Sequence, residues 1–157
     1  MRFEYDWPTE LNCYKFEVMK LPRPSDRLAG CVWLPRILAK ARQWQRGELP
    51  PEYAARFGHA SGVDGQFIAH FGLSREDILA AAVLSDERAA EWWLVRSSAE
   101  RVAQWNEIAQ NLGRPGYPMA ERLPVALATT YKHLAGRGLA TVFEVLEADE
   151  KGSETER

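Results

Sequence analysis

Basic side chains gather in one stretch of this 157-residue sequence, where they are suited to binding anions. Residues 20–46 hold seven Lys and Arg residues against the single acid Asp26, whereas the whole chain has a formal net charge of −2. Lysine and arginine attract phosphate and carboxylate groups, and the planar guanidinium can bind two oxygens of such a group at once. This stretch is therefore the first candidate for a binding site, its ligand being an anionic small molecule or an acidic protein surface.

A helix expected over residues 31–46 would separate these basic residues from apolar ones. At about 100° per residue, its Trp, Leu and Ile side chains fall on one arc and its basic side chains on the opposite arc. The basic arc consists of Arg36, Lys40, Arg42 and Arg46. We take Arg36, Lys40 and Arg42 as candidate ligand-binding residues. The alternative is that the arc is a solvated face, or is paired with acids elsewhere in the domain.

A second candidate region is the segment of residues 47–63, which holds two prolines and three glycines. Loops of this length are uncommon in compact domains and often carry function. Tyr53, His59 and Asp64, in or beside the segment, provide a phenol, an imidazole and a carboxylate. We add these three to the candidate ligand-binding residues and expect one cavity to join them to the basic arc. For Asp64, capping the next helix and pairing with Arg42 both remain open.

The same segment supports an alternative function, a small enzyme whose pocket uses His59, Asp64 and His70, with or without a metal ion. The three histidines, the third being His133, form no HxxxH or HExxH pair, so their spacing does not indicate a metal centre. The sequence also lacks a GxSxG nucleophile motif and a glycine-rich phosphate loop. We therefore assign no catalytic residue, no metal ligand and no cofactor, and keep the enzyme as the alternative.

The composition is that of one folded domain without a membrane span. Hydrophobic residues make up 46% of the chain and aromatic residues 11%, which excludes a disordered protein. No run of about 18 apolar residues occurs, and no signal peptide is recognisable. Cys13 and Cys31 lack metal-ligand spacing and are expected to be reduced, buried thiols of a cytoplasmic protein. The negative net charge disfavours nucleic acid as a partner.

The chain is expected to form three parts. Residues 1–21 alternate aromatic and charged residues, which is typical of a short β-hairpin or of an extended arm across the core. Residues 22–150 are expected to form a single helical domain. Residues 151–157 are expected to be a frayed polar tail.

Cap and stop signals predict six or seven short helices in the helical domain, so the fold class is mainly α, a compact irregular bundle. Ser25 and Asp26 are expected to cap a short segment that ends near Gly30. Apolar spacing predicts a helix over residues 119–134 that starts or kinks at Pro124. The other predicted helix starts, from capping patterns, are at Asp64, Ser74, Ser85, Ser97 and Thr141.

One pair of tryptophans raises the question of self-association. Trp92 and Trp93 are adjacent in a predicted helix, so they point about 100° apart and cannot both face one core. The second ring must face a neighbouring helix, a pocket or a subunit interface, where tryptophan is enriched. A homodimer is therefore among the expected partners.

Residues 30–42, GCVWLPRILAKAR, resemble the signature G-x-V-x-L-P-R-x-x-x-K-A-R of a family of bacterial domains of unknown function. The similarity continues at residues 64–67, 72–73 and 141–150, and covers roughly residues 22–150. The resemblance implies a compact helical domain without an assigned activity, and it supplies no mechanism. The hypothesis that follows from the residues is a non-catalytic binding module that engages an anionic ligand or an acidic partner through its basic helix face.

Overall fold

The computed structural model describes residues 20–155, with side chains through residue 151, and this part is mainly helical as predicted. The strands or arm expected in residues 1–21 lie almost entirely outside the described residues. In chain order the elements are β1 (Arg27–Leu28), β2 (Cys31–Val32), α2 (Leu34–Gln45), α3 (Pro51–Ala54), α4 (Val63–Phe71), α5 (Arg75–Ala82), α6 (Asp86–Arg96), α7 (Ala99–Gln110), α8 (Arg122–Ala128), the 3₁₀ turn η1 (Lys132–Leu134) and α9 (Val142–Thr155).

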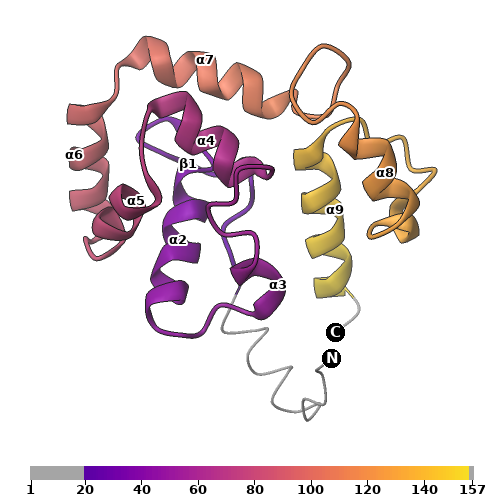
Figure 1. Ribbon diagram of the computed structural model, residues 1–157, viewed down its shortest axis with the longest axis horizontal. Helices are drawn as coiled ribbons and strands as arrows, with labels where there is room; N and C mark the ends of the chain where they lie inside the picture. Colours follow the sequence, from indigo (N-terminus) through magenta and orange to yellow (C-terminus); the bar gives the residue numbers. More distant parts are fainter. Residues whose placement is uncertain (1–19, 156–157) are drawn as a thin grey trace.

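Helix α7 joins two groups of helices. Figure 1 shows α7 crossing the top of the molecule, with α2, α4, α5 and α6 below one end and α8 and α9 below the other. In the first group α2 packs along α5, and in the second α9 packs against η1 and the end of α7. The short helix α3 lies at the lower edge of the first group, on the side that faces α9.

A two-stranded hairpin replaces the short capped segment expected after Ser25. Strands β1 and β2 pair antiparallel, Arg27 with Val32 and Leu28 with Cys31. The intervening Ala29 and Gly30 both have positive φ, 52° and 77°, as the tightest hairpin turns require. The expectation of a cap at Ser25 was wrong because its N–H and hydroxyl both donate to the distant carboxylate of Glu147, at 3.1 and 2.6 Å.

The core of the first group is built on aromatic rings. Trp93 and Trp105 are both 1% exposed, and each lies against Phe67 with ring centroids 5.5 and 5.3 Å apart. The indole N–H of Trp105 donates to the carbonyl of Val32 at 2.9 Å, which ties α7 to the hairpin. Trp92 is half-buried, and the guanidinium of Arg96 lies 4.9 Å from its ring. The second ring of the tryptophan pair thus packs at the edge of its own fold.

Local capping explains where four of the described helices begin, namely α5, α6, α7 and α9. Ser74 and Asp77 form a full capping box, Ser85 caps α6, and the hydroxyl of Thr141 accepts from the N–H of Glu144 at 3.1 Å. These starts were predicted. The cap of α7 is Ser98 and not Ser97, because the Ser98 hydroxyl accepts from the N–H of Arg101 at 3.1 Å.

Two predicted boundaries differ from the structure. The helix expected over residues 119–134 is divided, because Thr129 leaves helical geometry (φ −126°, ψ −89°) and the chain resumes as the turn η1. Pro124 lies in the first turn of α8, where its missing N–H costs no hydrogen bond. Helix α9 continues to Thr155, beyond the expected end of the domain at residue 150.

Within the described residues, no helix is long and apolar enough to cross a membrane. Cys31 is a free thiol in the core, and burial raises its pKa to about 12, so it stays protonated at neutral pH. Cys13 lies outside the described residues.

The cap of α7 provides a test with an adjacent control. Replacing Ser98 with alanine removes the acceptor of the Arg101 N–H, so we expect S98A to lower the free energy of unfolding by about 1 kcal/mol. Urea denaturation of S98A, and of S97A as the control, measures the free energy of unfolding of each variant. A larger loss for S97A than for S98A would contradict the observed cap.

Candidate functional site

A cleft of about 700 Å³ lies between the two groups of helices. Its floor comes from the start of α2, one wall from α3 and the α3–α4 segment, and the other wall from α8, the α8–η1 segment and α9. The wall of α8 and α9 is mainly apolar, whereas the α3 side is polar. The apolar residues of that wall include Leu123, Val125, Ala126, Val142, Val145 and Leu146.

Five of the six candidate residues from the sequence line this cleft, namely Arg36, Lys40, Tyr53, His59 and Asp64. The sixth, Arg42, does not. Its guanidinium donates to the carbonyls of Ala82 and Leu84, at 2.9 and 3.0 Å, and pairs with Asp86 at 3.0 Å. Arg42 therefore closes the C-terminal end of α5, where unpaired carbonyls favour a cation.

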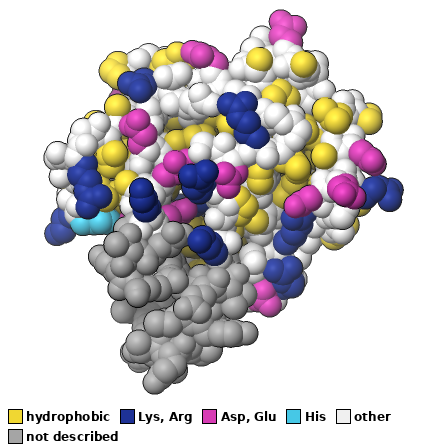
Figure 2. Space-filling view, turned by 180° about the vertical axis from the view of Figure 1, so that it is seen from behind, with side chains coloured by type: hydrophobic (Ala, Val, Ile, Leu, Met, Phe, Trp, Pro, Cys, Tyr) yellow, Lys and Arg dark blue, Asp and Glu magenta, His cyan; other side chains and the backbone are white. Residues whose placement is uncertain are grey.

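The basic face expected on α2 is not a solvated face. Arg36 is 2% exposed and Lys40 is 6% exposed, and each has a carboxylate partner. Arg46, the last member of the arc, pairs with Glu48 at 3.0 Å. Figure 2 shows acidic and basic side chains interspersed on the face seen from behind, without a single basic patch. The alternative that the arc is paired with acids elsewhere in the domain therefore holds for Arg36, Lys40 and Arg42, whereas Arg46 is exposed.

Asp64 connects three segments at the floor of the cleft. Its carboxylate accepts from the indole N–H of Trp33, just before α2, at 2.7 Å and from the N–H of Gly58 at 3.0 Å. It also pairs with the ammonium of Lys40 on α2 at 2.8 Å. Asp64 therefore neither pairs with Arg42 nor caps α4, although it lies in the first turn of that helix. Burial lowers the pKa of Lys40, and the adjacent Asp64 charge opposes that shift.

Trp33 has a backbone conformation that few residues adopt. Its φ is 72°, in the left-handed region, where a residue other than glycine costs about 1–3 kcal/mol. Stacking on Phe143 of α9, with ring centroids 5.5 Å apart, and the hydrogen bond to Asp64 offset that cost. Lys40 lies 5.0 Å from the Trp33 ring, so the indole also contributes to holding the buried cation. The strained residue thus orients the floor of the cleft.

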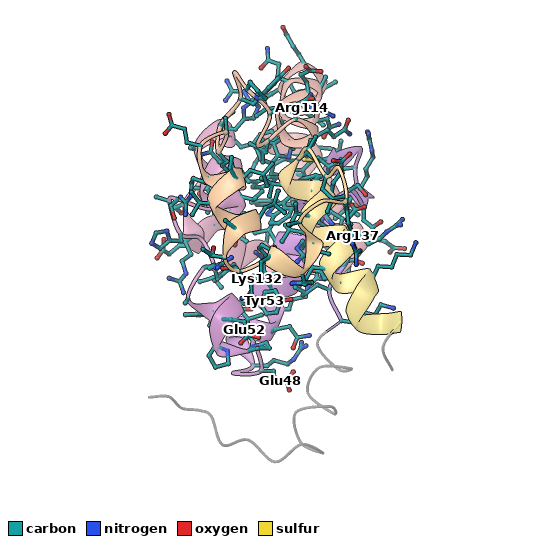
Figure 3. All side chains as sticks on the ribbon, turned by 90° about the vertical axis from the view of Figure 1, so that its right-hand side faces the viewer. Glu48, Glu52, Tyr53, Arg114, Lys132 and Arg137 are labelled. Carbon is teal, nitrogen blue, oxygen red and sulfur yellow. The ribbon has the colours of Figure 1, made fainter. Side chains whose placement is uncertain are left out.

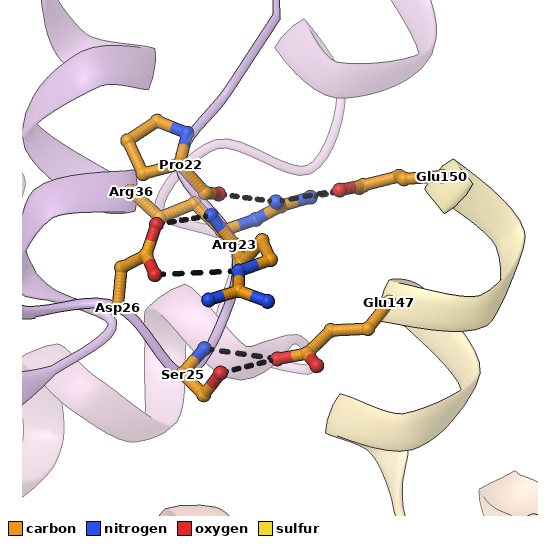
Figure 4. A network of polar contacts seen from close by, with 7 residues as sticks. All are labelled: Pro22, Arg23, Ser25, Asp26, Arg36, Glu147 and Glu150. Carbon is orange, nitrogen blue, oxygen red and sulfur yellow. Dashed lines mark hydrogen bonds and ion pairs between the residues drawn. The ribbon is translucent and has the colours of Figure 1, made fainter. Parts of the chain in front are cut away.

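A second ion pair joins the floor to α9. The guanidinium of Arg36 donates to both carboxylate oxygens of Glu150, and also to the carbonyl of Pro22 at 2.8 Å. One turn away, Glu147 accepts from Ser25, so two carboxylates of α9 hold the segment that enters the domain (Figure 4). These contacts hold the α9 wall of the cleft against its floor.

Two phenols line the cleft from opposite walls: that of Tyr53 from α3 (Figure 3), and that of Tyr131, the residue before η1. Burial, and then the charge of Glu150, raises the pKa of Tyr53 to about 12. Burial also raises the pKa of Tyr131, against the opposing charge of Arg56. Both side chains are therefore neutral hydrogen-bonding groups at physiological pH.

The histidines do not assemble the enzymatic pocket of the alternative hypothesis. His59 is exposed at the rim, where its Nδ1 accepts from the N–H of Ser61 at 3.1 Å. His70 does not line the cleft, and its Nε2 lies 3.0 Å from the carbonyl of Arg101. In residues 20–155, no three His, Cys, Asp or Glu side chains are placed to hold a metal ion. The structure does not bring His59, Asp64 and His70 together.

The cleft has further polar residues that the sequence did not single out, Arg56, Arg122 and Tyr131 among them. Arg56 lies three residues after Tyr53, in the turn that follows α3, where its N–H donates to the Tyr53 carbonyl at 3.1 Å, and this spacing is the available signal. Arg122 and Tyr131 are far from the other site residues in sequence, and only the fold brings them to the cleft.

The buried pair of Lys40 and Asp64 makes a stability prediction. Lys40→Met leaves a buried carboxylate without its cation, so we expect a loss of about 3–5 kcal/mol in the free energy of unfolding. Arg46→Met breaks the exposed pair with Glu48 and should cost less than about 1 kcal/mol. Chemical denaturation compares the two variants. Equal small losses would show that the Lys40 pair is solvated.

The phenol of Tyr53 makes a prediction about alkaline pH. An unfolded tyrosine ionises near pH 10, whereas Tyr53 in the folded chain keeps its proton up to about pH 12. The folded state therefore binds more protons between pH 10 and 12, and its stability falls as the pH rises through that range. We expect the unfolding free energy of the wild type to decline more steeply there than that of Y53F. Parallel slopes would contradict the burial of the phenol.

Comparison with known proteins gives a family but no function. No curated protein and no solved structure matched the chain significantly. A family model matches residues 19–152, which include every residue of the cleft described above, and confirms the expected membership in a family without an assigned activity. The chain belongs to the family described as "Domain of unknown function (DUF5069)".

Proposed function

We propose that this domain binds a small organic molecule with an apolar body and an anionic group, and that the cleft between α3 and the α8–α9 wall is the site. The observation that supports this most is the make-up of the cleft. Its volume of about 700 Å³ lies in the usual range for small-molecule sites, roughly 300–1,000 Å³. Such sites combine a mainly apolar lining with a few placed polar groups, as this one does.

The rim of the cleft supplies cations that can take an anionic group. Within residues 20–155, Arg56 and Arg122 form no ion pair with a carboxylate. Arg122 has a neutral hydrogen-bond partner, since it donates to the carbonyl of Ser61 at 2.8 Å, and Arg56 lies near the phenol of Tyr131, whose pKa burial raises and the Arg56 charge lowers. A hydrogen bond to a carboxylate or phosphate is about twice as strong as one to a neutral oxygen, so a bound anion is favoured over either partner.

The candidate residues from the sequence then divide into two roles. Tyr53 and His59 lie where they can contact the ligand, because both line the cleft and neither is fully buried. Arg36, Lys40 and Asp64 hold the floor, since their charges are already paired inside the protein. The anionic group of the ligand is therefore bound by residues at the rim of the cleft and not by the basic residues of α2.

Filling the cleft tests the proposal with decanoate, a ten-carbon fatty acid anion with one carboxylate at the end of an apolar chain. Ala126 of α8 lines the cleft and is half-buried, so Ala126→Trp places an indole in the ligand volume. Ala128 is on the same helix, is exposed and does not line the cleft. By titration calorimetry, we expect the wild type and A128W to bind decanoate alike and A126W to bind it at least about tenfold more weakly, or about 1.4 kcal/mol.

Two results would contradict the proposal. One is the absence of saturable binding to the wild type. The other is equal binding by A126W and A128W, which would place the ligand elsewhere on the surface. Thermal unfolding of both variants shows whether a loss of affinity is instead a loss of fold.

A further inference from the structure

The two rim arginines reach across the cleft from opposite walls. Arg122 begins α8 and donates to Ser61 in the α3–α4 segment, at 2.8 Å. Arg56 lies in the α3–α4 segment, and its charge lowers the pKa of Tyr131 against the effect of burial, so it lies near that residue, whose N–H donates to the Ala126 carbonyl at the end of α8. The two bridges therefore connect the same two walls, one at each end of α8. Each guanidinium has five N–H donors, so both keep donors for a further partner.

Helix α8 lies between the two bridges along its wall. This helix has seven residues, which corresponds to about 10 Å at 1.5 Å per residue. Between the bridges, the lining is apolar and includes Leu123 and Ala126 of α8 and Val145 of α9. A ligand that lies along α8 thus meets a guanidinium at each end and hydrocarbon side chains in between.

The acidic residues of the cleft do not cancel this arrangement. Asp64 and Glu150 are paired with Lys40 and Arg36, and Asp149 lies 2.8 Å from the Nε2 of His133. The remaining acids of the lining are Glu52 and Glu121. Both are exposed, so their carboxylates can point to solvent while a ligand occupies the cleft.

We infer that the ligand carries two anionic groups, one at each end of an apolar body about as long as α8, and that Arg56 and Arg122 each bind one of them. This inference rests on the proposed function and specifies its ligand class. It explains why two cations of the cleft that form no ion pair with any described carboxylate stand toward the two ends of its apolar lining. A ligand with one anionic group would leave one guanidinium with only its neutral partner.

A pair of ligands of equal length separates the two proposals. Decanedioate has a carboxylate at each end of a ten-carbon chain, decanoate has one, and succinate has two on a chain too short to reach both arginines. By titration calorimetry at about 0.15 M salt, we expect decanedioate to bind the wild type about tenfold more tightly than decanoate, and succinate to show no such gain.

Three variants assign the effect to its residues. Arg56→Gln and Arg122→Gln should each lower decanedioate affinity about tenfold and leave decanoate and decanedioate nearly equal. Arg137→Gln is the control, because Arg137 is exposed in the η1–α9 segment and does not line the cleft (Figure 3). If R122Q is poorly folded, Arg122→Lys takes its place in the test. This variant keeps the charge, so we expect it to retain most of the preference for decanedioate over decanoate.

The outcomes distinguish the two proposals. Equal binding of decanoate and decanedioate to the wild type overturns the inference of two anchors and leaves the proposed function standing. If only one of the two variants, R56Q or R122Q, removes the preference for decanedioate, the inference of two anchors is likewise overturned and the proposed function stands. If neither compound binds the wild type, both the inference and the proposed function fall.

Discussion

The buried carboxylate of Asp64 is the contact on which the site depends. Three donors from separate places in the chain converge on it: the Trp33 indole, the Lys40 ammonium and the Gly58 N–H. A charge that is 2% exposed is tolerated only when it is paired and hydrogen-bonded, and here every partner is present. The same contacts hold α2, α4 and the start of the α3–α4 segment in one arrangement. The floor and one wall of the cleft follow from that arrangement.

The second wall is fixed by a different set of long-range contacts. Glu150 pairs with Arg36 and Glu147 binds Ser25, so α9 is held against the beginning of the domain. Phe143 stacks on Trp33, which brings the apolar side of α9 onto the floor. These contacts join the two groups of helices at the floor of the cleft, and α7 joins them at a second place (Figure 1). Ligand binding in such a site requires little reorganisation of the floor, because its charges are already paired.

The contents of the site were easier to predict than its geometry. A long segment rich in proline and glycine often carries function, and this pattern points to Tyr53, His59 and Asp64. The structure does place these three residues around one cleft. The role of α2 was misjudged because helical periodicity separates apolar from charged side chains but does not say whether the charged side is solvated. Arg36 lies 114 residues from Glu150, and no local pattern relates two such positions.

The sequence alone determined the helical class, most helix starts and the apolar face of α2, because each depends on neighbours within about four residues. Ser74, Ser85 and Thr141 cap their helices through N–H groups three residues away, so their short-range chemistry is legible in the chain. Only the tertiary structure decided which charges are buried and where the cleft lies. Those properties depend on carboxylates that the fold brings from distant segments, and the free energy of burying a charge is set by the partners it meets there.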